Sequence, residues 1–438
     1  MASLPARRTG LAHLPLHGGR APRWLFRRMT DLARAMVLVI RQDYSAEDVL
    51  RRMSDPFWFQ AFGCVLGFDW HSSGLTTTVC GALKEGLRGL EDEAGLYVAG
   101  GKGATSRKTP AEVTAAGERI GLDPEPLVYA SRMAAKVDSA AVQDGYQLYH
   151  HTFMFTTQGA WAVVQQGMSD ATRYARRYHW LSEELESYVE EPHAAVAQGG
   201  GAHARPPAGG YGTSDVLNLV AAESAEGRRV ITRLAVEDGP EKIARELGRL
   251  VAAEADRGPS PIRGEPDESH TLDAPSAPVG GLRDRGYERP APRVGAGHAL
   301  LGAGNALPEL HMPAHHPVTA RDVNPDRIAR ALLSAYEQAP DDFEGLLALR
   351  GVGAKTLRAL SLVAELVHGV PLGHRDPALY SFAHGGKDGY PYPVDRAGYD
   401  ETVDQLTEAL RRARLRDRER LDALRRLAGM ARATGRAA

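Results

Sequence analysis

Apolar residues recur at the spacing of an α-helix near the start of the chain, over residues 24–40. After this run, Ser45 is followed three positions later by Asp48, a pattern that resembles a helix N-cap. The apolar residues Val49 and Met53 come next. The pattern therefore predicts a helical start to the chain.

Three later segments carry a different pattern, in which aromatic and β-branched residues are punctuated by glycine. They cover residues 62–87, 94–110 and 142–168. Such runs predict strands and loops. We therefore expect a mixed α/β domain of the α+β class over residues 1–198, and we place any catalytic site there.

The rest of the chain changes composition at recognisable points. Residues 198–212 predict a turn-rich or extended loop, and helical periodicity returns in a helical extension over residues 213–256. Residues 257–305 are dense in Pro, Gly, Asp and Arg, which is typical of a flexible linker. Because 438 residues exceed what one hydrophobic core usually supports, a separate all-α domain is expected over residues 307–438.

This C-terminal domain is expected to contain a helix-hairpin-helix. Residues 324–339 show one helical pattern. Residues 343–369 show two more, separated by a glycine turn, RGVGAK, at residues 350–355. The glycines let the backbone turn sharply and approach a phosphate, and N–H groups at the start of the next helix point toward it. Val352 is expected to fill the space between the helices. The candidate nucleic-acid contacts are Gly351, Val352, Gly353, Lys355, Thr356, Lys108 and Lys387.

Such an element binds backbone phosphates without reading bases, so the predicted binding is independent of sequence and sensitive to salt. An ordinary corner between two helices is the alternative.

Residues 346–368 resemble the helix-hairpin-helix of DNA repair proteins, including base-excision glycosylases of the endonuclease III type. In bifunctional members of that family, the lysine after the second glycine is the amine that attacks the sugar, and an aspartate follows further along. Lys355 matches the lysine, and Asp376 is the nearest match to the aspartate. The residues after Asp376 depart from the glycosylase pattern.

Six motifs along the chain resemble a second, uncharacterised family, catalogued as domain of unknown function 763. They are LPLHGGRAPRWL, FDWHSSG, AGGKG, VQDGYQLYHHTF, RRYHWLSE and YSFAHGGKDG. This resemblance covers nearly the whole chain and implies no activity.

Charge is segregated, although the formal net charge is only −2. Residues 1–53 hold ten arginines against four acids, and residues 411–438 hold ten against three. Basic ends suit a phosphate-contacting surface, and solvated helices are the alternative. The expected partner is nucleic acid, with DNA as its expected form.

Two cysteines, Cys64 and Cys80, are too few for a disulfide framework or a cysteine zinc site. No apolar run approaches the roughly 20 residues that span a bilayer. We therefore expect a cytoplasmic protein without a membrane segment.

A polar segment interrupts apolar sequence at residues 68–73, FDWHSS. Asp69 and His71 are two positions apart, so on a strand they share a face and can reach one cation. We expect them to bind a metal or a phosphate. The alternative is a hydrogen-bonded turn.

Glycine and lysine gather at residues 99–108, AGGKGATSRK. Lysine is rare in this chain, seven against 46 arginines, so it is expected where a compact ammonium is needed. Glycine amides with Lys102 and Lys108 predict a cradle for a backbone phosphate. The spacing is not that of a nucleotide-binding P-loop, and a surface loop is the alternative.

Acids, imidazoles and amides follow two predicted strands within residues 136–168. Alternation places Tyr146 and His150 on one face, with Gln147 and His151 on the other. A carboxylate, an imidazole and a lysine beside a strand pair are groups that phosphodiester hydrolysis needs. The candidate catalytic residues are Asp69, His71, Lys102, Asp144 and His150. The candidate ligands of Mg²⁺ or Mn²⁺ are Asp69, His71, Asp144 and His150. Buried histidines bonded to their neighbours are the structural alternative.

Three functions are compatible with these patterns. The first is a DNA-processing or repair enzyme, most simply a metal-dependent nuclease acting on structured, mismatched or damaged DNA. The second is a base-excision glycosylase/lyase that uses Lys355 and Asp376. The third is a DNA-binding protein without enzymatic activity.

Overall fold

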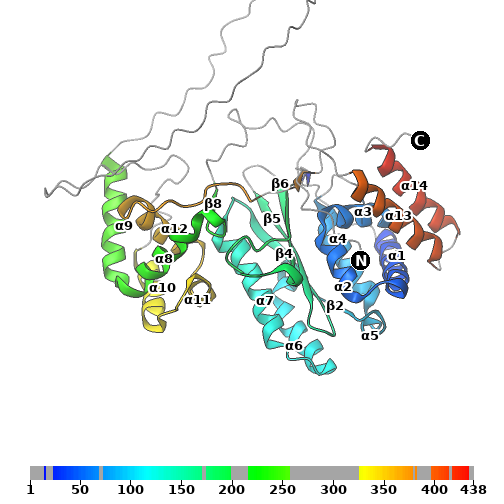
Figure 1. Cartoon of the computed structure of the whole chain (residues 1–438), viewed down its shortest axis with the longest axis horizontal. Coiled ribbons are helices and arrows are strands. Elements are labelled where there is room, and N and C mark those ends of the chain that lie inside the picture. Colours follow the sequence, from blue (N-terminus) through cyan, green and yellow to red (C-terminus); the bar gives the residue numbers. More distant parts are fainter. Residues whose placement is uncertain are drawn as a thin grey trace, which may run out of the picture.

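The computed structural model describes residues 14–15, 23–68, 73–169, 174–198, 216–256, 325–377, 380–381, 396–413 and 417–433. Within these residues, one sheet carries helices on both of its faces (Figure 1). Most of the sheet is antiparallel, so the fold is of the α+β class, as predicted.

The main sheet has the order β2-β4-β5-β6-β7-β9, and β1 pairs with β6. Its strands are β1 (Leu14–Pro15), β2 (Leu96–Lys102), β4 (Gln147–Thr156), β5 (Trp161–Ser169), β6 (Tyr174–Leu181), β7 (Ala195–Gln198) and β9 (Tyr380–Ser381). A separate pair joins β3 (Val142–Gln143) to β8 (Leu217–Asn218). The predicted strands in residues 94–110 and 142–168 are confirmed as β2, β4 and β5.

One face of the sheet, here called the α4 face, is covered by helices from both ends of the chain (Figure 1). These are α1 (Arg23–Asp43), α2 (Ala46–Ser54), α3 (Pro56–Leu66), α4 (Gly74–Leu87), α13 (Arg396–Arg412) and α14 (Asp417–Ala433). The short α5 (Glu91–Ala94) leads into β2. The helical start is confirmed, and Ser45 and Asp48 form the capping box of α2.

The expectation of strands over residues 62–87 was wrong, because this segment forms the end of α3 and all of α4. Its glycines permit close helix packing. A Cβ at Gly63 would lie 2.6 Å from the Leu75 side chain, and one at Gly86 would lie 2.8 Å from the Thr30 carbonyl oxygen of α1. Tertiary contacts therefore outweigh the strand propensity of the local sequence.

The opposite face, here called the α7 face, is covered first by α6 (Thr109–Ile120) and α7 (Glu125–Lys136). A wider π-type turn, η2 (Val137–Ala141), continues α7. Beyond it lie α8 (Ala225–Glu237), α9 (Gly239–Asp256), α10 (Pro325–Gln338), α11 (Phe343–Ala348), α12 (Ala354–Leu362) and the π-type turn η5 (Val363–Val367) (Figure 1). Short 3₁₀ turns are η1 (Gly103–Lys108), η3 (Ser182–Glu184) and η4 (Ala222–Ser224).

The C-terminal residues divide between the two faces instead of forming the one domain expected over residues 307–438. Leu332, Leu346 and Leu357 join the core of the α7 face. Leu406 and Leu410 of α13 join the core of the α4 face. The apolar stripes of α10–α12 and of α13–α14 are thus buried against different partners.

The expected linker at residues 257–305 lies outside the described residues, as do residues 199–215. None of the described helices has the length and apolar character needed to cross a membrane.

Candidate functional site

A row of polar side chains crosses four strands of the sheet. Lys102 of β2 is paired with His150 of β4, His150 with Gln166 of β5, and Gln166 with Arg177 of β6. We call these four residues the polar row. Two of its members, Lys102 and His150, were predicted as catalytic, and the structure brings them together.

Within the described structure, each of the two central side chains keeps one buried polar atom unpaired. His150 and Gln166 are only 1% and 0% exposed. His150 Nε2 lies 2.9 Å from Thr152 Oγ1, and Gln166 Nε2 donates to the Ser73 carbonyl (2.8 Å) and to the Tyr149 hydroxyl. Among the described residues, His150 Nδ1 and Gln166 Oε1 have no hydrogen-bond partner. Because an unpaired buried polar atom costs stability, the pair is a candidate for a functional role.

His150 and the neighbouring Tyr149 are uncharged at neutral pH. Burial, with His151 and Lys102 nearby, lowers the pKa of His150 to about 3, so its imidazole is neutral and keeps a lone pair. Burial raises the pKa of Tyr149, so its phenol keeps its proton. A neutral imidazole and an amide oxygen can accept a hydrogen bond or bind a cation.

The cations of the polar row lie at its two ends. Lys102 is exposed, and its ammonium lies 5.7 Å from the Tyr149 ring centroid. Arg177 is fully buried and donates to His179 Nε2 (2.9 Å) and Gln60 Oε1 (3.0 Å). Burial lowers the pKa of Arg177 to about 9. Sequence reasoning missed Arg177, because strand register cannot be recognised among many arginines.

Asp69 and His71 lie outside the described residues. The described chain resumes at Ser73, which precedes α4 and accepts the hydrogen bond from Gln166. The end of the predicted polar segment is therefore held at the centre of the polar row.

The glycine segment at the end of β2 supports the sheet. The Gly100 N–H donates to Glu112 Oε2 (2.7 Å), and Lys84 Nζ donates to the Gly100 carbonyl (2.9 Å). A Cβ at Gly100 would lie 2.3 Å from the His151 carbonyl oxygen, so only glycine fits. Because a carboxylate already accepts from this amide, the predicted anion cradle does not form at Gly100. Lys108 is exposed at the end of η1.

Asp144 lies on the opposite face of the sheet from His150. Its buried carboxylate accepts from Arg176 Nη1 and the Tyr178 hydroxyl, each at 2.7 Å. Arg176 Nη2 also donates to Asp376 Oδ2 (2.8 Å). One cation cannot bind Asp144 and His150 together, so the predicted set of four metal ligands does not form.

A bulge in β4 explains why simple strand alternation assigned Tyr146 and His150 to the same face. The register with β5 shifts between Leu148 and His150. Tyr146 lies against Arg176 on the α7 face, with the guanidinium 4.4 Å from its ring centroid. His150 instead shares the α4 face with Met154. The prediction that Tyr146 and His150 share a face was therefore wrong.

A second buried network lies on the α7 face. Asp138 is 0% exposed and accepts from Gln165 Nε2 (2.5 Å) and Trp180 Nε1 (3.0 Å), and His193 Nε2 lies 2.5 Å away. Gln165 also contacts His151 Nδ1 at 2.7 Å. These polar groups are bonded to one another, so the network stabilises the packing of α7 on the sheet.

The glycine turn joins α11 to α12 on the α7 face. Gly351 has a φ of +96°, and Val352 is 2% exposed, so its predicted burial is confirmed. Lys355 is exposed, whereas the Thr356 side chain is only 6% exposed and is therefore unsuited to the predicted nucleic-acid contact. Lys387 lies outside the described residues.

The turn is fastened to the rest of the protein. Lys136, at the end of α7, donates to the carbonyls of Leu347 and Leu349. Gln143 of β3 donates to the Ala354 carbonyl (2.8 Å) and accepts from Arg358 Nε (2.8 Å). The α11–α12 turn therefore has a fixed position relative to α7.

The comparisons with known proteins give a family. A family model described as "Protein of unknown function (DUF763)" matches residues 10–394. The chain belongs to this family. No curated protein and no solved structure matches the chain. The matched DUF763 region contains the polar row and the α11–α12 turn, whereas α13 and α14 follow it.

Within the described part of this DUF763 protein, one group of side chains has the composition of a metal site. Ligand atoms of Asp238, Glu246 and His368 lie within 4.8 Å of one another. Lys242 Nζ lies 2.8 Å from Asp238 Oδ2. This ammonium offsets the charge of the carboxylate and competes with a metal for it.

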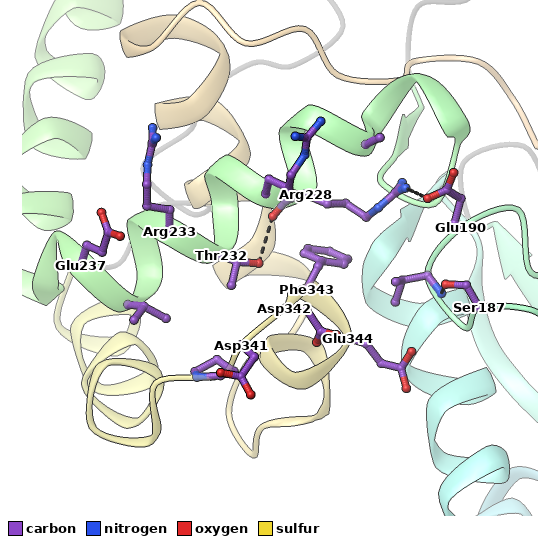
Figure 2. A pocket seen from close by; sticks show the side chains of 15 residues that line it. Ser187, Glu190, Arg228, Thr232, Arg233, Glu237, Asp341, Asp342, Phe343 and Glu344 are labelled. Carbon is purple, nitrogen blue, oxygen red and sulfur yellow. Dashed lines mark hydrogen bonds and ion pairs between the residues drawn. The ribbon is translucent and has the colours of Figure 1, made fainter.

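A pocket of about 570 Å³ lies between α8 and the start of α11. Figure 2 shows cationic side chains on α8 and acidic ones beside α11. Arg228 donates to Glu190 at 2.6 Å (Figure 2). Five acidic residues and three arginines line the pocket, and Glu190 is already paired with Arg228, so no wall of a single charge selects a ligand class.

Proposed function

We propose that this DUF763 protein binds the phosphate backbone of nucleic acid at the α11–α12 turn. The observation that carries the proposal is the arrangement of the turn: Arg350, Gly351 and Lys355 are exposed around the start of α12, above the buried Val352. Gly353 provides no side-chain cap for this helix. The first turn of α12, with its partial positive charge, therefore suits a phosphate oxygen.

Binding is tested on the full chain with labelled duplex DNA between about 50 and 200 mM salt. Lys355→Ala is expected to weaken binding of all sequences alike and to reduce the salt slope by about one. Arg229→Ala serves as the control, because this arginine is 75% exposed but lies on α8. Equal affinity of Lys355→Ala and the wild-type chain would contradict the proposal.

We also propose phosphodiester cleavage at the polar row, which the unpaired atoms of His150 and Gln166 favour. The exposed ammonium of Lys102 is suited to offset charge on a phosphate, and the neutral His150 imidazole is suited to accept a hydrogen bond that orients a water molecule. A divalent cation such as Mg²⁺ or Mn²⁺ would supply further charge compensation.

The cleavage assay uses labelled single-stranded, mismatched and branched DNA, with and without Mg²⁺ or Mn²⁺. Lys102→Ala is expected to reduce cleavage by at least tenfold with folding retained, because Lys102 is exposed. Intact binding without cleavage of any substrate would leave a non-enzymatic binder as the function.

The lyase alternative receives no support from Asp376. Its carboxylate accepts from Arg176 at 2.8 Å, an ion pair that ties it to β6. Borohydride trapping on abasic DNA, compared between the wild-type chain and Lys355→Ala, separates a lyase from a hydrolase.

A further inference from the structure

The first turns of α1 present an exposed aromatic ring among cations. Trp24 is 61% exposed, and the Arg28 guanidinium lies 5.6 Å from its ring centroid. Arg23 and Arg27 are also exposed. Arg27 and Arg28 follow Trp24 by three and four positions, so the three side chains share one side of the helix. We call Arg23, Trp24, Arg27 and Arg28 the α1 surface.

The arginines of the α1 surface are unfavourably placed with respect to the helix dipole. The N-terminus of a helix carries partial positive charge, which favours acids and disfavours arginine. The first turn of α1 has no acidic residue. Within the described chain, none of Arg23, Arg27 and Arg28 forms a salt bridge, whereas Arg51 and Arg52 of α2 do. Three arginines at a helix N-terminus suit an anion from outside the protein.

Leu25, the residue after Trp24 in α1, packs against the end of α3. A Cβ at Gly67, which ends α3, would lie 3.7 Å from Leu25 Cδ1 and 3.8 Å from Arg426 Cζ. Leu25 and the cationic Arg426 therefore meet at Gly67, six positions before Ser73. Ser73 is the residue bonded to Gln166. The α11–α12 turn lies on the other face of the sheet (Figure 1).

We propose that the α1 surface binds single-stranded nucleic acid, with a base stacked on Trp24 and phosphates bound by the arginines. An exposed aromatic ring beside cations is the arrangement that holds unpaired bases, since every base offers a face for stacking. A duplex keeps its bases stacked on each other and offers Trp24 no such face. The inference rests on the proposed nucleic-acid function and names its substrate class.

A membrane surface fits the α1 surface less well. A helix that lies in a membrane interface needs a broad apolar face free to enter the lipid. The apolar side of α1 is instead buried in the protein core, with Met29, Met36 and Val37 each 0% exposed. Among the described large apolar residues of α1, Trp24 is the one left exposed at the surface, at 61%, and a ring among arginines suits a polyanion with stackable groups.

The test measures anisotropy of the full chain with a short labelled oligothymidylate and with a labelled duplex. Trp24→Ala is expected to weaken oligothymidylate binding by about 5- to 100-fold and to leave duplex binding within twofold, whereas Trp24→Phe keeps most of the affinity. Tyr336→Ala is the matched control, because Tyr336 is an aromatic residue that is 49% exposed on α10. Arg27→Gln is expected to lower the salt slope by about 0.7.

Unchanged oligothymidylate binding by Trp24→Ala overturns the proposal, and so does an equal loss for duplex and single strand. A Trp24 effect confined to phosphatidylserine vesicles also overturns it and indicates a membrane surface. Lys355→Ala, measured on the same duplex, keeps the two proposals apart. If Lys355→Ala weakens binding and Trp24→Ala does not, only the proposal for the α1 surface is wrong. If Trp24→Ala weakens binding and Lys355→Ala does not, only the proposal for the α11–α12 turn is wrong.

Discussion

His150 of β4 lies directly opposite Gln166 of β5, and each keeps one buried polar atom that is unpaired among the described residues. On the other face of the same strands, His151 and Gln165 are also directly opposite, but they are bonded to each other at 2.7 Å. The two adjacent His/Gln pairs thus differ in their hydrogen bonds. His151 and Gln165 are bonded to each other, whereas His150 and Gln166 each keep an atom without a described partner. This contrast allows structural and functional roles to be separated by experiment.

Gln165→Met is expected to reduce stability more than Gln166→Met, whereas only Gln166→Met is expected to abolish cleavage. Gln165→Met deprives buried Asp138 of a 2.5 Å hydrogen bond and is expected to lower the free energy of unfolding by about 3 kcal/mol, with cleavage per folded molecule retained. Gln166→Met is expected to cost about 1–2 kcal/mol and to abolish cleavage. Urea unfolding and single-turnover cleavage measure the two effects. Identical behaviour of the variants would show that Gln166 has no special role.

Stability is expected to fall as the pH drops below about 6.5. Burial lowers the pKa of His151 and His179, and it lowers that of His150 to about 3. Between the folded and unfolded pKa values the unfolded chain binds more protons, so the free energy of unfolding rises with pH there. Each histidine contributes up to about 1.4 kcal/mol per pH unit.

Urea unfolding at pH 7 and at pH 5.5 tests this acid sensitivity. A His151→Asn variant is expected to show a shallower dependence on pH, because one titrating group is removed. A free energy of unfolding that is constant over this interval would mean that the buried histidines are protonated in the folded protein.

Asp144→Ala is expected to destabilise the protein by about 3–5 kcal/mol, because it breaks a buried ion pair and leaves Arg176 short of a partner. Glu183→Gln breaks the half-exposed pair with Arg51 and is expected to cost under about 1 kcal/mol. Thermal unfolding of both variants measures the difference. If Asp144→Ala is fully stable but does not cleave, Asp144 has a catalytic role and not a structural one.

Local sequence patterns predicted the elements that have a local signal, such as a run of strand-forming residues or a helix cap. The strands β4 and β5 followed from aromatic and β-branched runs, and α2 from the cap at Ser45. The helices α3 and α4 could not be predicted in this way, because Gly63 and Gly86 look like breaks in a helix until their packing partners are known. Their role depends on contacts between elements.

The polar row was only partly predictable for a similar reason. Lys102 and His150 stood out as rare or reactive residue types, but their pairing depends on the register of β2 with β4. The bulge at Leu148 to His150 then reversed the face that simple alternation assigns. Gln166 and Arg177 carry no signal of their own. They join the row only through the order of the strands.

Two glycines in the α11–α12 turn allow backbone conformation and phosphate access to be tested separately. Gly351 has a φ of +96°, so Gly351→Ala is expected to lower the free energy of unfolding by about 1–2 kcal/mol through backbone strain. Gly353 has a φ of −149°, and a Cβ there would meet nothing within 4 Å, so Gly353→Ala is expected to cost under about 1 kcal/mol.

For duplex DNA binding the order is expected to be reversed, with the larger loss of affinity for Gly353→Ala. The methyl group of Gly353→Ala stands at the start of α12, where the proposal places a phosphate, and is expected to weaken binding by about tenfold, as the loss of a charge-assisted contact does. Below its unfolding temperature, Gly351→Ala is expected to bind within about threefold of wild type if its strain is confined to the turn. Anisotropy titrations paired with unfolding curves check both points. If Gly353→Ala binds as tightly as the wild-type chain, the phosphate does not approach α12, and the exposed cations alone must account for any binding at this turn.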